Sequence, residues 1–435
     1  MQNPPGSANP VSQADVSQTV EHLFRHESGK MVAILTGIFG PEHLTLAEDV
    51  VQEALVRALQ TWPYYGVPNN PSAWIMRASR NLALDFVRRQ KTFREKEPEV
   101  IRLIESRSHL VEAHDEQEIA DDRLRLMFVC CHPSLPPEMQ VALALKTLCG
   151  FSVTEISRAF LTTEAATAKR LTRARQKIQE ARIAFEIPSG PDLIPRLDGV
   201  LHALYLLFNE GYKASAGENL IRKDICDEAI RLGTLLSSHA VGNQPATHAL
   251  LALMFLNTAR MPARLDPDDN LVRLCDQDRS KWDQSLIARG MFELAESASG
   301  PIVTIYHLQA GIAACHCAAP DQQSTDWSKI LELYDQWIAF DNSPVVALNR
   351  AVAVAEVRGP AEGLAAIRTI GDLKSLENYY LLHSVLGELE LRMNHCLAAA
   401  VHLEKALSLA EIKSERNFLE QKLKSCHPTP QPAAA

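Results

Sequence analysis

Residues 151–182 read FSVTEISRAFLTTEAATAKRLTRARQKIQEAR and predict two short helices with a break between them. Ser152, followed three residues later by Glu155, is the capping-box pattern that begins a helix. Thr163 can cap the second helix in the same way. The apolar spacing of that second helix predicts a buried face of Ala168, Leu171, Ala174 and Ile178 and a basic outer face of Lys169, Arg170, Arg173 and Lys177.

A helical hairpin whose second helix has a basic outer face is typical of a helix-turn-helix that lies in a DNA groove. The alternative is a solvated amphipathic hairpin, which occurs in many helical proteins. The stretch alone does not decide between the two, so the interpretation depends on the rest of the chain.

The composition limits the class of protein. At 435 residues the chain is long enough for two or three domains, and 46% hydrophobic with 22% charged residues is ordinary for a globular protein. No run of about 18 apolar residues occurs, and the first residues lack the pattern of a signal peptide. Nine irregularly placed cysteines favour free thiols over a disulfide framework. We therefore expect a cytoplasmic protein.

The charge is unevenly distributed along the chain. The formal net charge is −9, but residues up to about 187 are close to neutral and the remainder carries most of the negative excess. This balance argues against general coating of nucleic acid, so a DNA contact has to be local. Lys169 to Arg182 is one place with the required positive charge.

Two helical segments are expected near the N-terminus. An apolar pattern over residues 16–39 predicts one or two helices that end at Gly40-Pro41. Thr45 with Glu48 resembles another capping box, which would begin the next helix. A polar stripe on such a helix usually faces only water. Here the stripe consists of Asp49, Gln52, Glu53 and Val56.

An aromatic segment and a basic helix follow. Thr61–Pro71 (TWPYYGVPNNP) predicts a loop because it contains three prolines, a glycine and Asn-Asn, and it is unusually aromatic. A helix is expected from Pro71 or Ser72 to about Gln90. Its predicted buried face is Trp74, Ile75, Ala78, Leu82 and Phe86, and its exposed face is Arg77, Arg80, Asn81, Leu84 and Arg88. Positive charge beside aromatic rings suits base stacking and phosphate binding, and the alternative is a solvated helix end.

The second half of the chain has a different organisation. Residues 96–122 are strongly acidic and predict a partly helical linker, and Pro188–Pro191 indicates a domain boundary, with a hinge over 188–197. Residues 198–423 are helical throughout, and two segments that begin near Pro344 and Tyr379 superpose with a shift of about 34–35 residues, the period of a tetratricopeptide repeat. Stacked hairpins of this kind typically bind protein or peptide. Residues 1–14 and 424–435 are expected to be disordered tails.

No motif for catalysis or metal binding is recognisable. The sequence contains no phosphate loop and no dinucleotide fingerprint. Cys130-Cys131-His132 and Cys315-His316-Cys317 lack the paired spacing of a zinc site. We therefore expect no catalytic residue, no metal and no cofactor, which argues against an enzyme.

Three N-terminal segments together resemble the bacterial sigma-70 family, in particular its small extracytoplasmic-function (ECF) type. AEDVVQEALVRAL at 47–59 is similar to the family's helix that binds core polymerase, and AWIMRASRNLALDFVRR at 73–89 resembles its minus-ten reading helix. Residues 135–175 resemble the region 4 domain, and the C-terminal half is similar to the tetratricopeptide-like extension of one sigma subgroup. Ala168 departs from the pattern, because small sigma factors often have Lys there, so promoter preference cannot be carried over.

The resemblance implies an all-α fold with sigma region 2 at 15–95, region 4 at 123–187 and a helical-repeat C-terminal domain. It implies that core RNA polymerase binds through its β′ clamp helices and β flap, and that promoter DNA is the second partner. The polymerase-binding residues would be Asp49, Gln52 and Glu53. The minus-ten strand would meet Trp62, Tyr64, Arg77, Arg80, Asn81, Arg88 and Arg89, and the minus-thirty-five element would meet Lys169, Arg170, Arg173 and Lys177.

Two other interpretations remain open. One is a helix-turn-helix regulator that is not a polymerase subunit and whose helical C-terminal domain senses a ligand or a protein. The other is an interaction scaffold built on the repeats. In the sigma-factor interpretation, we expect the C-terminal domain to bind a protein or peptide and to regulate when the sigma surfaces are available.

Overall fold

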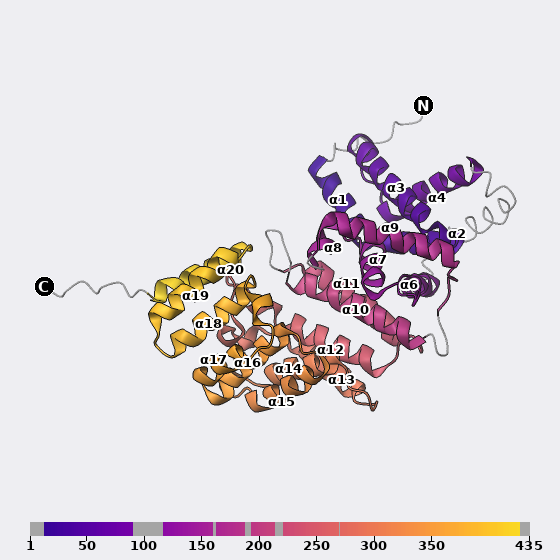
Figure 1. Ribbon diagram of the computed structural model, residues 1–435. Coiled ribbons are helices and arrows are strands. Elements are labelled where there is room, and N and C mark those ends of the chain that lie inside the picture. Colours follow the sequence, from indigo (N-terminus) through magenta and orange to yellow (C-terminus); the bar gives the residue numbers. More distant parts are fainter. Residues whose placement is uncertain are drawn as a thin grey trace. The chain divides into compact units, whose positions relative to one another are not determined.

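The computed structural model describes residues 13–89, 116–159, 162–187, 193–213, 221–268 and 270–426. Every regular element in these ranges is a helix, apart from one isolated bridge between Leu265 and Leu271 (Figure 1). The predicted all-α fold class is therefore confirmed. The chain divides into two compact units, residues 1–207 and 208–435.

Unit 1 contains the segments that carry the family resemblance. Its helices are α1 (Gln13–His26), α2 (Ser28–Phe39), the 3-10 helix η1 (Pro41–His43), α3 (Leu44–Tyr65), α4 (Pro71–Arg89), α6 (Glu116–Cys130), α7 (Pro137–Cys149), α8 (Val153–Ala159), α9 (Glu164–Ala181) and α10 (Leu193–Tyr212) as far as Leu207. Most of the expected tail 1–14 and linker 96–122 lies outside the described residues, but residues 116–122 form the first turns of α6.

The predicted start of α3 is wrong. Thr45 does not cap this helix, because the 3-10 helix η1 leads directly into α3 at Leu44. Glu48 does not reach back to an N-cap either. Its carboxylate is buried against residues far along the chain.

The predicted loop 61–71 is wrong in its first half. The helix α3 continues through Tyr65 with Pro63 inside it, and ends at Gly66, whose φ of 82° lies in the left-handed region that glycine tolerates. Prolines and aromatic residues indicated a loop, but packing of Trp62 in the core extends the helix by more than a turn.

The predicted buried face of α4 is rotated relative to the structure. Leu84 is buried and Phe86 is 36% exposed, the reverse of the expectation. α4 packs on α3, and the fully buried Ser79 and Ala83 lie on the contact face. These small residues permit a close helix approach, which turns the larger Phe86 outward.

The helix-turn-helix forms as predicted. Ser152 and Glu155 make both capping-box hydrogen bonds. The Ser152 N–H donates to Glu155 Oε2 at 2.8 Å, and the Glu155 N–H donates to Ser152 Oγ at 3.1 Å. The Ala166 N–H donates to Thr163 Oγ1 at 3.2 Å. On α9 the buried stripe is Thr167, Leu171, Ala174 and Ile178. Ala168 is exposed, contrary to the prediction, since Thr167 lies one turn before Leu171 and takes the buried place.

Unit 2 is a succession of helical hairpins. After the end of α10, from Phe208 to Tyr212, its helices are α11 (Lys223–Ser238), α12 (Pro245–Ala259), α13 (Gln284–Ser297), α14 (Ile305–Ala318), α15 (Trp327–Phe340), α16 (Pro344–Arg358), α17 (Pro360–Arg368), α18 (Tyr380–Arg392), α19 (Cys396–Leu409) and α20 (Lys413–Cys426). The short 3-10 helices between them are η4 (Met261–Ala263), η5 (Leu274–Asp276), η6 (Arg279–Lys281) and η7 (Leu373–Leu376).

The two predicted repeats correspond to the hairpins α16–α17 and α18–α19, and α20 follows them (Figure 1). Gly387 on α18 is buried against α19, and a Cβ atom there would lie 2.8 Å from Leu403 Cγ. Ala399, Leu403 and Ala406 are buried, as the repeat pattern predicts. The close helix contact at Gly387 explains why this position carries no side chain.

Candidate nucleic-acid interface

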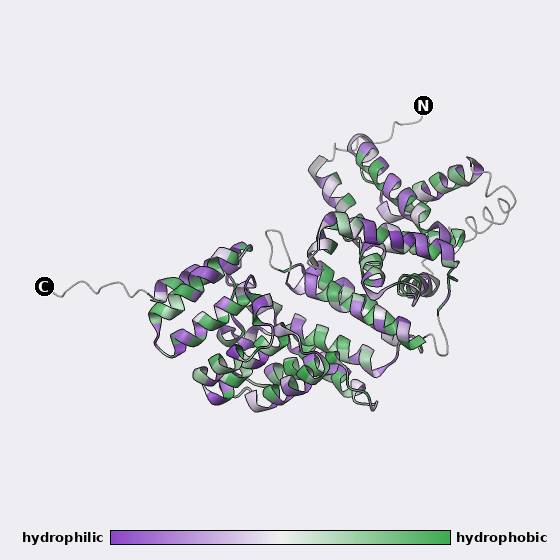
Figure 2. Cartoon of the chain, in the orientation of Figure 1, coloured by the Kyte–Doolittle hydropathy of each residue, from purple (hydrophilic) through white to green (hydrophobic). Residues whose placement is uncertain are grey.

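α9 presents a basic outer face. Lys169, Arg173 and Lys177 are exposed and follow one another at intervals of four residues, so they lie on one side of the helix. No ion pair involves these three side chains in the part of the chain that the structure describes. α9 is also one of the more hydrophilic helices of unit 1 in Figure 2. This face can therefore meet phosphate groups without first breaking an ion pair.

Arg170 differs from the other basic residues of α9. It is partly buried, and its Nη2 atom lies 2.8 Å from Glu138 Oε2 on α7. This ion pair holds α9 on its neighbour. In this conformation Arg170 positions the helix, and Lys169, Arg173 and Lys177 form the accessible basic face.

α4 carries a second group of polar side chains. Arg77, Asn81 and Arg88 are exposed, as predicted, whereas Arg80 is partly buried and its Nε atom has no acceptor among the described residues. Arg89 ends α4, and its side chain lies outside the described residues. α4 packs on α3, whereas α9 packs on α7, α8 and η1, so the two basic faces have separate supports.

Two tyrosines stand at the end of α3. Tyr64 and Tyr65 are 84% and 82% exposed. Large aromatic side chains this exposed are unusual on a protein surface and suit stacking against unpaired bases. Tyr64 was predicted from the sequence, and the adjacent Tyr65 is exposed to a similar extent.

Trp62 is a correction to the predicted site. It is only 1% exposed and makes an edge-to-face contact with Trp74, with ring centroids 5.4 Å apart. A side chain this buried cannot contact DNA in this conformation. Trp62 belongs to the core that holds α3 against α4.

The acidic stripe of α3 borders a groove. Asp49, Gln52 and Glu53 are exposed, as predicted, and Glu53 is paired with Arg57 at 3.2 Å. A groove of about 510 Å³ lies beside them, between α1 and α3, with Lys146 of α7 on its wall. Its lining residues are Ser17, Val20, Phe24, Gln52, Leu55, Val56, Leu59 and Lys146.

Leu59 lines the groove and is a candidate residue that the sequence interpretation missed. Val56 and Leu59 are 45% and 41% exposed, although both are apolar. Leu59 lies two turns after Gln52 on the same side of α3, so helical spacing could have identified it. The exposed surface of α3 is therefore polar at Asp49, Gln52 and Glu53 and apolar at Val56 and Leu59. Such a combination is typical of a surface that binds an amphipathic helix.

Glu48 connects α3 with the helix-turn-helix. Its Oε1 atom accepts a hydrogen bond from Thr147 Oγ1 at 2.7 Å, and its Oε2 atom accepts from Arg175 Nε at 2.9 Å. Burial raises the pKa of the neighbouring Asp49, while the charge of Arg175 acts in the opposite direction. The helix-turn-helix thus lies close to the acidic stripe in this conformation.

Two segments of unit 1 match known domains. Residues 23–93 match the family described as Sigma-70 region 2, and residues 125–178 match Sigma-70, region 4. The chain therefore contains sigma-70 regions 2 and 4. Region 2 therefore comprises the α3 stripe, the tyrosines and α4, and region 4 comprises the helix-turn-helix with α9.

The C-terminal half has a different match. Residues 196–298 match a family of unknown function, DUF6596. An uncharacterized protein of Rhizobium meliloti strain 1021 is 39% identical over 383 residues, which cover 88% of this chain and 90% of that protein. The similarity therefore extends through both units.

Two similar proteins are named as RNA polymerase sigma factors. The ECF RNA polymerase sigma factor SigE of Mycolicibacterium smegmatis is 29% identical over 161 residues, or 37% of this chain and 60% of that protein. The probable ECF RNA polymerase sigma factor SigI of Mycobacterium tuberculosis is 27% identical over 212 residues, or 46% of this chain and 70% of that protein. No solved structure matches the chain.

The described residues include neither a membrane-spanning helix nor a metal-binding cluster. Among these residues, no helix has the length and apolar character needed to cross a bilayer. The same residues contain no group of three or more His, Cys, Asp or Glu side chains placed to hold a metal ion.

Proposed function

We propose that this chain is a sigma factor of the extracytoplasmic-function type, which binds core RNA polymerase and directs it to promoters. The observation that carries the proposal is the combination of region 2 and region 4, in that order, with exposed surfaces suited to each task. The ECF relatives of low identity support the same type.

The groove on α3 is the proposed polymerase-binding surface. Asp49, Gln52 and Glu53 supply an acidic rim, and Val56 and Leu59 supply apolar contact area. A helical partner with one basic and one apolar side complements both, such as the clamp helices of the polymerase β′ subunit that the family resemblance implies. The β flap is the second polymerase contact expected from the same resemblance.

The two basic faces are the proposed promoter contacts. Lys169, Arg173 and Lys177 on α9 would meet the minus-thirty-five element, the arginine reaching a guanine edge or a phosphate and the lysines mainly phosphate. Tyr64 and Tyr65, with the exposed polar face of α4, would hold the melted minus-ten strand. The partly buried Arg80 would play a supporting role.

Glu48 implies that the free chain must open before it acts. Its bonds to Thr147 and Arg175 tie region 2 to region 4, and Lys146 of region 4 lines the groove proposed for polymerase. The proposal requires region 2 and region 4 to contact two separate promoter elements at once, which the Glu48 contacts would restrict in this conformation. Polymerase binding and release of the Glu48 contacts are therefore coupled in this proposal.

The C-terminal unit is proposed to regulate this opening or to bind a protein or peptide partner on its hairpins. A truncation can test the idea if it leaves α10 whole, because a Cβ atom on Gly199 would lie 2.4 Å from Gln140 Oε1 and 3.2 Å from Cys131 Cβ. A chain that ends after Tyr212 keeps this contact, whereas one that ends at Ser189 removes it. Unchanged promoter-dependent transcription and unchanged response to the inducing signal would end the regulatory proposal.

Binding of core polymerase is the experiment that tests the function. We expect the full chain to bind core enzyme and Val56→Asp to abolish binding, since a charge would enter the apolar groove. Thr45→Ala, at an exposed position outside the groove, should bind as the wild type does. A wild-type chain that fails to bind core polymerase would favour a helix-turn-helix regulator that acts on DNA alone.

A further inference from the structure

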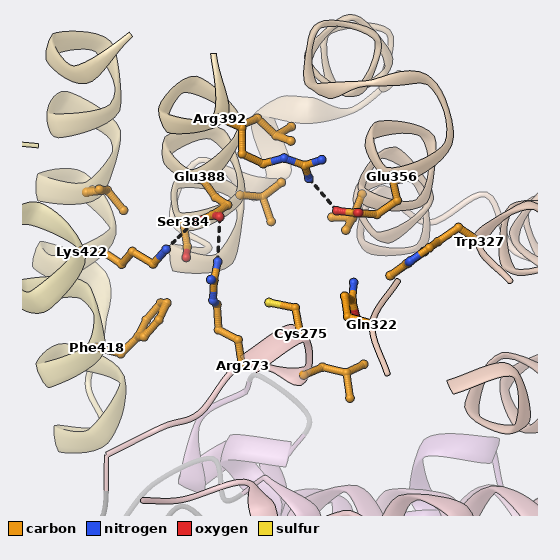
Figure 3. A pocket seen from close by; sticks show the side chains of 15 residues that line it. Arg273, Cys275, Gln322, Trp327, Glu356, Ser384, Glu388, Arg392, Phe418 and Lys422 are labelled. Carbon is orange, nitrogen blue, oxygen red and sulfur yellow. Dashed lines mark hydrogen bonds and ion pairs between the residues drawn. The ribbon is translucent and has the colours of Figure 1, made fainter. Parts of the chain in front are cut away.

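Unit 2 contains a cavity that no part of the proposed sigma function uses. It has a volume of about 290 Å³ and lies among α16, α18, α19 and α20, with η5 and the start of α15 closing it (Figure 3). Pockets for small molecules have volumes of about 300–1,000 Å³, so this one is of a size for a small metabolite and too small for a folded element.

Three charged groups on one side of the cavity already have partners. Glu388 accepts from Arg273 Nη1 at 2.7 Å and from Lys422 Nζ at 2.9 Å, and Arg273 also donates to Asp276 (Figure 3). Burial would raise the pKa of Glu388, but the hydrogen bonds from Lys422 and Arg273 overcome this effect and lower it. Both carboxylate oxygens of Glu388 are therefore occupied, so this residue forms a wall of the cavity and is not free to bind a ligand.

Arg392 lines the cavity one turn after Glu388 on α18, at a position that is exposed to solvent. Arg392 donates through Nη1 to Glu356 Oε1 at 2.5 Å, and no other hydrogen bond of its guanidinium occurs within the described ranges. Gln322 Nε2 and Trp327 Nε1 also have no acceptor there. Since a guanidinium has five N–H donors, most of the capacity of Arg392 is unused.

The rest of the lining is apolar. The remaining wall includes the apolar residues Leu274, Val352, Val385, Leu389, Leu403 and Phe418. A ligand that fits must therefore have an apolar body and, at one end, acceptors for several N–H groups. A planar carboxylate meets this requirement, because its two oxygens match the fork of a guanidinium.

We infer that this cavity binds a small organic acid, with its carboxylate on Arg392 and its apolar body between Phe418 and Val385. The acid shares Arg392 with Glu356, which holds the guanidinium at the edge of the cavity in its absence. The inference does not depend on the proposed sigma function, since it concerns a site within unit 2 alone.

The test uses the full chain, with 4-phenylbutyrate as the probe and 4-phenylbutyramide as its uncharged counterpart. Titration calorimetry measures the affinity of both. Alkylation of Cys275 by iodoacetamide, followed by peptide mass spectrometry, reports occupancy, because Cys275 lines the cavity with its sulfur directed inward (Figure 3). Cys396, which does not line the cavity, serves as the internal reference. We expect the acid to slow alkylation of Cys275 at least threefold and to leave Cys396 unchanged.

Two variants should act in opposite directions on the acid. Arg392→Gln removes the guanidinium and should weaken binding of the acid about tenfold or more, as expected for lost charge-assisted hydrogen bonds, with little effect on the amide. Glu356→Gln removes the competing carboxylate and should tighten binding of the acid. Arg368→Gln, an exposed arginine of α17 outside the cavity, is the matched control.

These variants distinguish recognition from a structural role. Both Arg392→Gln and Glu356→Gln break the same ion pair, so a merely structural role predicts that both impair binding equally. That result would overturn the inference. Equal affinity for the acid and the amide would overturn it as well. So would a failure of the acid to protect Cys275 from alkylation at about 10 mM, a concentration well above the range of specific affinities. Ser384→Phe, which fills the cavity, should abolish binding of both probes while the helical circular dichroism is retained. Wild-type binding by that variant would also contradict the inference.

Discussion

Glu48 and Arg175 are separated by 127 positions in the chain and form a buried ion pair in unit 1. The Nε and Nη2 atoms of Arg175 lie 2.9 and 2.8 Å from Glu48 Oε2, and only 7% of Glu48 is exposed. Thr147 Oγ1 satisfies the other carboxylate oxygen. Because removal of one partner leaves a buried charge, this contact controls how easily region 2 and region 4 separate.

Glu48→Gln should loosen the contact between the two regions. The loss of a hydrogen bond to a charged group costs about 1.5–3 kcal/mol, so we expect faster hydrogen exchange in η1 and the C-terminal half of α9. If separation is required for function, affinity for core polymerase should rise at the same time. Glu180→Gln, on an exposed part of α9, is the matched control. Faster exchange with unchanged polymerase affinity would show that the contact is structural and does not control binding.

Trp62 and Tyr64 lie two residues apart and should respond in opposite ways. Trp62→Ala removes a fully buried indole and should destabilise unit 1 by about 3–5 kcal/mol in a denaturant titration. Tyr64→Ala should leave stability within about 0.5 kcal/mol, since the ring is 84% exposed, but weaken binding to single-stranded minus-ten DNA in the assembled holoenzyme. Loss of stability in Tyr64→Ala would contradict its assignment as a stacking residue.

Lys169→Ala and Lys177→Ala test the α9 face by salt dependence. Each lost phosphate contact should reduce the slope of log affinity against log salt by about 1, measured for the holoenzyme on duplex promoter DNA. Gln179→Ala, which is exposed on a different side of α9, should leave the slope unchanged. If Lys169→Ala and Lys177→Ala keep the wild-type slope, as Gln179→Ala should, this face does not bind phosphate.

The helix-turn-helix could be predicted from the sequence because its signals are local. Ser152, Glu155 and Thr163 act on backbone groups within three residues of themselves, so their pattern is sufficient to place the two helices. The exposure of the α3 stripe also followed from helical spacing. The same holds for the helix hairpins near Pro344 and Tyr380, whose packing repeats along the chain.

The parts that could not be predicted depend on contacts between distant segments. Glu48 was interpreted as a cap because Thr45 precedes it, and no local pattern indicates Arg175 or Thr147 as its partners. Trp62 was placed in a loop for the same reason, since its burial depends on Trp74 across the interface between α3 and α4. The cavity of unit 2 gathers residues from five helices and η5, so no single stretch of sequence indicates it.

His316 should make the stability of unit 2 depend on pH. Burial, and then the charges of Arg260 and Arg279, lower its pKa from 6.5 to about 3. The unfolded chain therefore binds a proton that the folded chain does not. The contribution of neutral His316 to the free energy of unfolding is complete above about pH 6.5 and is lost as the pH falls toward 3, by about 1.4 kcal/mol per pH unit. Over this range the protection factors of the α14 amides, which are corrected for the intrinsic pH dependence of exchange, should fall in the wild type and fall much less in His316→Phe. The exposed His395→Phe is the control, and an identical pH dependence in all three proteins would refute the assignment.

Run-off transcription tests the central claim most directly. Core RNA polymerase reconstituted with the full chain should produce discrete transcripts from fragments of the host genome, which core enzyme alone does not. Val56→Asp in the α3 groove and the paired change Lys169→Ala with Arg173→Ala on α9 should each reduce these transcripts at least tenfold, while Thr45→Ala and Gln179→Ala leave them unchanged. Transcripts that do not depend on the chain, or that persist undiminished in both groups of variants, would contradict the account.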